Sequence, residues 1–80
     1  MTKDMDFGEA LHALKAGKRV KRAGWNGKGM FVSCVPAVRK AYEGKIENHN
    51  AYFTISSPDD TVSTWVPSVN DCLAIDWSIL

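Results

Sequence analysis

The stretch Arg22-Ala23-Gly24-Trp25-Asn26-Gly27-Lys28-Gly29-Met30 carries the side chains best suited to binding a ligand. Its three glycines let the backbone turn sharply and approach a bound molecule closely. Trp25 offers a flat ring on which a base can stack, and Asn26 can both donate and accept hydrogen bonds. Backbone N–H groups, together with Lys28, can hold a phosphate. The alternative interpretation is an ordinary glycine-rich turn whose tryptophan fills the core.

No catalytic motif accompanies this loop. The sequence contains no GxSxG elbow, no HExxH, no Walker loop and no GxGxxG. Asp71 and Asp76 are a candidate carboxylate pair, but their place at a helix-to-strand junction favours a helix cap and a structural hydrogen-bond acceptor. Cys34 and Cys72 are too far apart for a CxxC site, and no Cys/His pair has the spacing of a zinc finger. We therefore expect a binding protein without metal or cofactor, and not an enzyme.

The length and charge of the chain further restrict the class of protein that this sequence can encode. Eighty residues make one domain, 1–80, whose small core favours a homo-oligomer. No signal peptide and no membrane span are evident, so we expect a cytoplasmic protein. A net charge of +1 argues against a general nucleic-acid coat. Positive residues are nevertheless concentrated in one part of the chain, which suits a small anionic ligand: Lys15, Lys18, Arg19, Lys21, Arg22 and Lys28.

The elements that must position the loop follow from periodicity and capping. Asp6 and Glu9 form a capping-box pattern before an apolar stripe, which predicts a helix from about Phe7 to Ala16 that ends at Gly17. A short helix 69–73 is predicted after Ser68, with Asp71 in the matching position. Alternating or apolar runs predict the strands 19–22, 30–35, 51–56, 61–66 and 74–79.

These elements define an α+β fold, with an N-terminal helix packed on an antiparallel sheet of four or five strands. The segment 37–50 is expected to be a loop with a short helical or extended turn. Each of the three tryptophans lies beside polar groups, an arrangement that can sandwich a base. Trp77, in the terminal strand, is the candidate for the core.

The combined motifs resemble a known family. The GWNGKGM loop together with the tail Trp65-Val66-Pro67-Ser68-x-x-Asp71-x-Leu73-Ala74-x-Asp76-Trp77 resembles the Thoeris anti-defence 2 family of small phage and prophage proteins. The N-terminal Phe7-Gly8-Glu9-Ala10-Leu11 adds to the resemblance, whereas residues 37–60 match no motif. The resemblance implies a non-enzymatic sponge that binds TIR-derived cyclic ADP-ribose isomers (glycocyclic ADP-ribose) without cleaving them and so blocks Thoeris immunity.

Partners also follow from the resemblance. It implies homo-oligomers, dimers or tetramers, in the cytoplasm of an infected bacterial host, with cyclic dinucleotides as possible further ligands at a separate site. It implies no membrane partner and no stable nucleic-acid partner.

Contacts to the ligand are predicted only at positions of this chain that match the family's motifs. Trp25 would stack on the adenine and Asn26 would bind a polar edge. The backbone of Gly27-Lys28-Gly29, with Arg22, would meet the pyrophosphate. The ribose hydroxyls would be bound by Thr64, Ser68 and Asp71.

Three other interpretations stay open beside this one, among them a nucleotide-processing enzyme, which turnover of the ligand would reveal. A nucleotide or single-stranded nucleic-acid binding module would use the same tryptophans and lysine, but its binding would depend strongly on salt. A protein-interaction domain would use the tryptophans as interface anchors.

Overall fold

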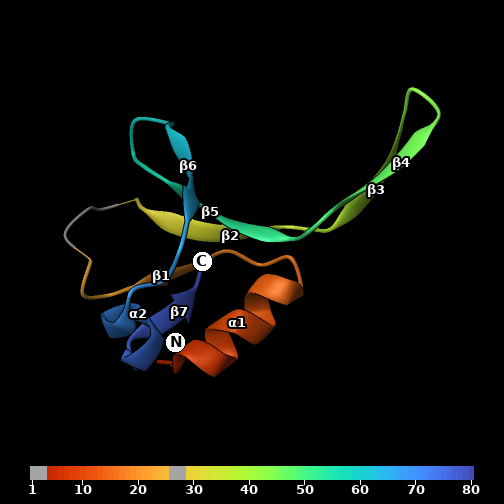
Figure 1. Ribbon diagram of the computed structural model, residues 1–80. Helices are drawn as coiled ribbons and strands as arrows, with labels where there is room; N and C mark the ends of the chain where they lie inside the picture. Colours follow the sequence, from red (N-terminus) through yellow and green to blue (C-terminus); the bar gives the residue numbers. More distant parts are fainter. Residues whose placement is uncertain (1–3, 26–28) are drawn as a thin grey trace.

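Two short helices lie on one side of a twisted antiparallel sheet from which a long hairpin projects (Figure 1). The computed structural model describes residues 4–25 and 29–80. The predicted α+β class is confirmed. Its elements are α1 (Phe7–Lys15), β1 (Val20–Arg22), β2 (Phe31–Val35), β3 (Val38–Tyr42), β4 (Lys45–His49), β5 (Tyr52–Ser56), β6 (Val62–Trp65), α2 (Val69–Leu73) and β7 (Trp77–Ile79).

Local capping fixes both helices. The carboxylate of Asp6 accepts a hydrogen bond from the backbone of Glu9, and the Glu9 side chain accepts one from the backbone of Asp6. Gly17 has φ +88°, a left-handed conformation that favours glycine, and it lies just beyond the C-cap residue Ala16. The predicted N-terminal helix is confirmed to within one residue, and α2 has the predicted bounds and capping box.

The main sheet has the strand order β6-β5-β2-β1-β7, and all its neighbours are antiparallel. Five strands agree with the predicted four or five. Both helices of the described residues lie on one face of this sheet (Figure 1). Residues that pair across antiparallel strands lie on the same face of the sheet. The register therefore determines which side chains lie on the face that packs against α1.

The core lies between α1 and the centre of the sheet. Ala10, Ala13 and Leu14 of α1 pack with Val20, Val32 and Trp77, all of them buried. Trp77 has no exposed surface, and its Nε1–H donates to the carbonyl oxygen of Asp71 at 3.0 Å. The prediction that Trp77 is the core tryptophan is therefore confirmed.

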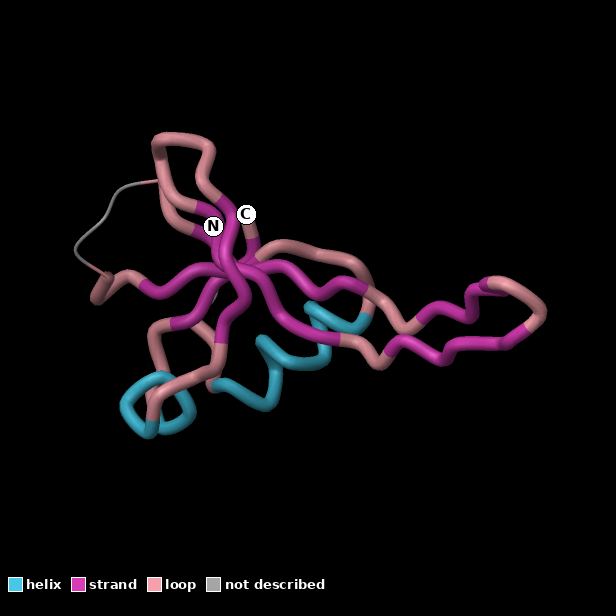
Figure 2. Tube along the Cα trace, turned by 45° about the horizontal axis from the view of Figure 1, so that its top comes forward, coloured by secondary structure: helices cyan, strands magenta, loops and turns pink. Residues whose placement is uncertain are grey.

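The sequence-based prediction is wrong for one segment of the chain. Residues 37–50 form no loop with a short turn but a two-stranded hairpin, β3–β4, which we call the arm (Figure 2). Glu43 and Gly44 join its strands with φ +48° and +79°, and two successive positive φ values define the type I′ turn of tight hairpins. The sequence did not reveal this turn because glutamate is a rare residue at its first position, where asparagine or aspartate is usual.

The last strand also differs from its prediction. It covers only Trp77–Ile79, whereas the alternating pattern predicted residues 74–79. Residues 74–76 instead connect α2 to the strand, because Ala74 is the C-cap residue of α2. The carboxylate of Asp76 in this connection accepts a hydrogen bond from Arg22.

The arm contributes little to the rest of the fold. All ten residues of β3 and β4 are exposed, and the two strands pair only with each other. We expect that joining Val35 to Tyr52 directly through Asn-Gly, in place of residues 36–51, changes the thermal midpoint by less than about 3 °C, because few buried contacts are lost. Circular dichroism melting of the shortened chain tests this. A midpoint far below that of the full chain would show that the arm stabilises the sheet.

Candidate functional site

The end of β1, the start of α2 and the residue before β7 meet at a charged cluster. Arg22 donates from Nε to Asp76 Oδ1 and from Nη1 to Asp71 Oδ1, each at 2.9 Å. The three side chains are between 12% and 29% exposed. A guanidinium held by two carboxylates at this depth forms strong, charge-assisted hydrogen bonds. The cluster ties the N-terminal half of the chain to its C-terminal tail.

The Asp71 carboxylate accepts hydrogen bonds from three residues in this cluster. Its Oδ2 accepts a hydrogen bond from Ser68 N at 3.0 Å, while its own backbone N–H donates to Ser68 Oγ at 3.1 Å, which completes the capping box of α2. Its Oδ1 accepts from Trp25 Nε1 at 3.4 Å as well as from Arg22. Asp71 therefore connects the start of α2 to both Arg22 and Trp25.

Asp76 holds the root of the glycine-rich loop. Its Oδ2 accepts from Gly24 N at 2.8 Å, and its carbonyl oxygen accepts from Ala23 N at 3.1 Å. A Cβ atom at position 24 would lie 3.0 Å from Asp76 Oδ2, a tight contact, so a larger residue there would push this carboxylate away by a few tenths of an ångström. The chain that leads into Trp25 is consequently fixed from the tail side.

Hydrogen bonding shifts the pKa values of all three charged groups. Burial on its own would raise the pKa of Asp71, but the hydrogen bonds from Ser68, Arg22 and Trp25 outweigh it and lower that pKa. The bond from Arg22 lowers the pKa of Asp76. Hydrogen bonds to Asp76 and Asp71 raise the pKa of Arg22. Both carboxylates are therefore ionised near neutral pH.

These shifts predict an acid-sensitive fold. A carboxylate whose pKa is lower in the folded state stabilises the fold above its ordinary pKa of 3.8, and this stabilisation is lost as the pH falls through the folded-state value. We expect the free energy of unfolding to decrease steeply below about pH 4. Urea titrations between pH 7 and pH 2 measure this. Asp76→Asn is expected to flatten the acid limb, and an unchanged limb would contradict the assignment.

A cluster of aromatic rings extends from this site across the sheet. Trp25 meets Trp77 edge-on at 5.4 Å between ring centroids and Trp65 at 6.3 Å. Trp65 in turn contacts Trp77 at 6.1 Å and Phe53 at 5.9 Å. Trp25 is only partly buried. Trp25 therefore packs edge-on against Trp77 and Trp65, and part of the residue stays exposed to solvent.

The structure brings together four of the eight predicted ligand-binding residues: Arg22, Trp25, Ser68 and Asp71. Thr64 does not join them. It neighbours Trp65 on β6 and pairs with Thr54, so it lies on the opposite face of the sheet. The predictions for Asn26, Gly27 and Lys28 fall outside the described residues. The roles assigned to all eight stay predictions.

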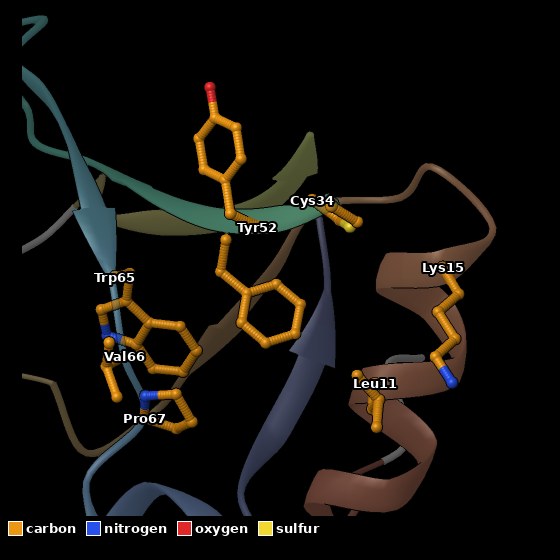
Figure 3. Close-up of a pocket in the computed structure, with 9 residues that line it drawn as sticks. Leu11, Lys15, Cys34, Tyr52, Trp65, Val66 and Pro67 are labelled. Carbon is orange, nitrogen blue, oxygen red and sulfur yellow. The ribbon is translucent and has the colours of Figure 1, made fainter. Parts of the chain in front are cut away.

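Sequence reasoning did not find the pocket beside this cluster. A pocket of about 390 Å³ opens between α1 and the β5–β6 pair (Figure 3). One wall of the pocket follows from the register of the sheet, in which Cys34 pairs with Phe53 and Phe53 with Trp65 in one row across three strands. Its lining residues are Leu11, Lys15, Cys34, Ala51, Tyr52, Phe53, Trp65, Val66 and Pro67.

Neither a metal site nor a membrane helix is found in the part of the chain that the structure describes. Within residues 4–25 and 29–80, no group of three His, Cys, Asp or Glu side chains is placed to hold a metal ion. The helices in these ranges are also too short and too polar to cross a membrane. The chemistry of the described residues is that of ion pairs, aromatic rings and an apolar pocket.

Fold and site together define a small α+β domain in which an aromatic cluster and a partly buried ion-pair network connect β1 to the C-terminal tail. Residues 5–80 match the family model Tad2-like, the Thoeris anti-defense 2-like domain. The chain is 39% identical to the protein Thoeris anti-defense 2 of Bacillus phage SP01 over an alignment that covers all of this chain and 99% of that protein. The chain therefore belongs to the Thoeris anti-defense 2-like family, and the resemblance noted in the sequence is confirmed.

Proposed function

We propose that this protein inhibits Thoeris immunity during phage infection by binding and sequestering TIR-derived cyclic ADP-ribose isomers without cleaving them. Membership of the Thoeris anti-defense 2-like family over almost the whole chain carries the anti-Thoeris part of this proposal. The sequestration step rests on the sequence resemblance and on the aromatic and cationic side chains available for an anionic nucleotide. The protein would act in the cytoplasm of the infected bacterium.

An experiment separates sequestration from its alternatives. The purified protein is incubated with a preparation of TIR-derived cyclic ADP-ribose isomers, free ligand is removed by filtration, and the retained fraction is denatured by heat. Release of intact ligand would support sequestration. Release of an altered molecule would make the protein an enzyme, and absence of any retained ligand would leave the protein-interaction domain as the leading interpretation.

The same assay addresses the stacking role predicted for Trp25. Trp25→Ala is expected to abolish retention while circular dichroism still reports a folded chain. An unfolded product would instead assign Trp25 to the core, the other interpretation of the loop. Titrating salt in the assay distinguishes a compact ligand pocket from a single-stranded nucleic-acid site, because the latter would weaken steeply with ionic strength.

We also propose that the protein is a homo-oligomer, a dimer or tetramer. Only six hydrophobic residues are buried among those that the structure describes, a thin core even for 80 residues. Apolar side chains around α2 stay largely exposed in the single chain, with Val66, Val69, Leu73 and Ile75 each at least 74% exposed. Sedimentation equilibrium measures the assembled mass, and a monomer at micromolar concentration would contradict the proposal.

A further inference from the structure

Asp76 contacts three successive residues at the start of the glycine-rich loop. Its Oδ1 accepts a hydrogen bond from Arg22 Nε at 2.9 Å, and its Oδ2 accepts one from Gly24 N at 2.8 Å. Its carbonyl oxygen accepts a third from Ala23 N at 3.1 Å. We call residues 22–25 the loop root. Asp76 was not among the predicted ligand-binding residues, yet it makes most of the hydrogen bonds that fix the path of the loop root.

The last residue of the loop root is held less firmly by its own hydrogen bond. Trp25 Nε1 donates to Asp71 Oδ1 at 3.4 Å, a length at which an N–H···O bond is weak. The indole ring also packs edge-on against Trp65 and Trp77. The orientation of Trp25 therefore depends on this ring packing and on the short backbone bonds that Asp76 accepts from the two preceding residues.

We infer that Asp76 is a positioning residue for ligand binding: it fixes the loop root so that Trp25 is oriented before the ligand arrives, and it makes no contact with the ligand itself. Both of its carboxylate oxygens are already bonded, one to Arg22 and one to Gly24. The inference rests on the proposed function, in which Trp25 stacks on the base. A binding side chain that is fixed in advance loses less conformational entropy on binding, so this orientation raises affinity.

The charge of Asp76 distinguishes positioning from a direct electrostatic effect. The ligand of the proposed function is an anion, and a nearby carboxylate weakens the binding of an anion. If charge were decisive, Asp76→Asn would therefore bind the ligand more tightly. The asparagine amide, however, has one acceptor oxygen in place of two, so it cannot accept from both Arg22 and Gly24. We expect Asp76→Asn to retain the ligand about tenfold more weakly than the wild type.

A control variant on β5 separates loss of positioning from loss of stability. Ile55 packs against the core from β5, which β2 separates from β1 in the sheet. Ile55→Ala destabilises the fold but removes no hydrogen-bonding group. Retention of the TIR-derived cyclic ADP-ribose isomers is measured by filtration at a temperature at which circular dichroism shows every variant to be folded. We expect Ile55→Ala to change retention less than about twofold.

Gly24→Ala perturbs the same hydrogen bond from its other side. Gly24 does not have a positive φ, so alanine can adopt its backbone conformation, and the added Cβ would lie 3.0 Å from Asp76 Oδ2. We expect about threefold weaker retention for this variant. Independent effects would multiply to about thirtyfold in the double variant with Asp76→Asn, whereas a shared hydrogen bond predicts no more than about tenfold.

Amide hydrogen exchange measures the loop root without any ligand. In Asp76→Asn, the amides of residues 23–25 are expected to exchange about tenfold faster relative to those of β2, because their local opening is no longer opposed by the carboxylate. In Ile55→Ala the same ratio should equal that of the wild type. Exchange rates are read by nuclear magnetic resonance.

The outcomes separate this inference from the proposed function. Equal or tighter retention by Asp76→Asn, or an equally large loss in Ile55→Ala, would overturn the positioning role and leave sequestration standing. Multiplying effects of Asp76→Asn and Gly24→Ala, or an unchanged exchange ratio in Asp76→Asn, would do the same. No retention by the wild type would overturn both. If Asp76→Asn does not fold, Gly24→Ala is compared with Ile55→Ala, and equal retention by these two would overturn the inference.

Discussion

Trp77→Ala will destabilise the fold more than any other single truncation in the described core. The indole has no exposed surface, and its ring meets Phe7 at 5.6 Å and Trp25 at 5.4 Å between centroids. Its N–H also satisfies the carbonyl of Asp71. Removing a buried tryptophan typically costs about 3–5 kcal/mol, which in a domain of this size lowers the thermal midpoint by roughly 15–30 °C. Thermal melting followed by circular dichroism measures this loss.

Two further variants serve as controls for the Trp77→Ala measurement. Trp77→Phe keeps an aromatic ring but removes the N–H, so its midpoint should lie between those of the wild type and Trp77→Ala. Tyr42→Ala removes an aromatic side chain that is 63% exposed on the arm, and it should leave the midpoint nearly unchanged. A Trp77→Ala protein that melts with the wild type would show that the core does not depend on this ring.

Asp71→Ala is expected to have the next largest effect. The substitution removes a capping-box acceptor, one carboxylate of the Arg22 pair and the acceptor of Trp25 N–H in one step. Breaking one partner of a largely buried, hydrogen-bonded ion pair costs about 3 kcal/mol, because the other charge loses its compensation. The thermal midpoint should therefore fall by roughly 10–20 °C. Urea unfolding at pH 7 gives the corresponding free energy.

The controls for Asp71 separate charge from shape. Asp71→Asn keeps the size of the side chain and an acceptor oxygen for Ser68 and Arg22, so we expect a smaller loss in the free energy of unfolding than for Asp71→Ala. Because the amide does not titrate, the stability of this variant should depend less on pH in the acid range than that of the wild type. Asp4→Ala removes an exposed carboxylate at the N-terminal end and should change the free energy of unfolding by less than about 0.5 kcal/mol. Equal losses for Asp71→Ala and Asp4→Ala would contradict the structural role of Asp71.

Features determined by near neighbours could be predicted from the sequence. Asp6 with Glu9, and Ser68 with Asp71, are capping pairs three residues apart, and both helices lie where these pairs predict them. Strands with strong β-branched or aromatic runs, such as Phe31–Val35, were also predicted to within one residue. The arm was missed because its turn uses Glu43, a residue that carries no local turn signal.

Features determined by distant residues could not be predicted from one sequence. Arg22 lies 49 residues before Asp71 and 54 before Asp76, and nothing in their spacing indicates that they pair. Asp71 was predicted as a cap, which is confirmed, but its bond to Trp25 was not foreseen. The pocket depends on the register of three strands and on the placement of α1, so it emerged only from the assembled sheet.

The arm also changes how the protein behaves in solution. It extends the molecule to 49 × 27 × 25 Å and gives a radius of gyration of 14.5 Å, whereas a compact chain of 80 residues has about 12 Å. A monomer of this shape diffuses more slowly than a sphere of equal mass and leaves a sizing column earlier. Calibration against globular standards therefore overstates the mass of a single chain, so an apparent dimer by elution volume does not count as two chains until sedimentation equilibrium gives the same mass.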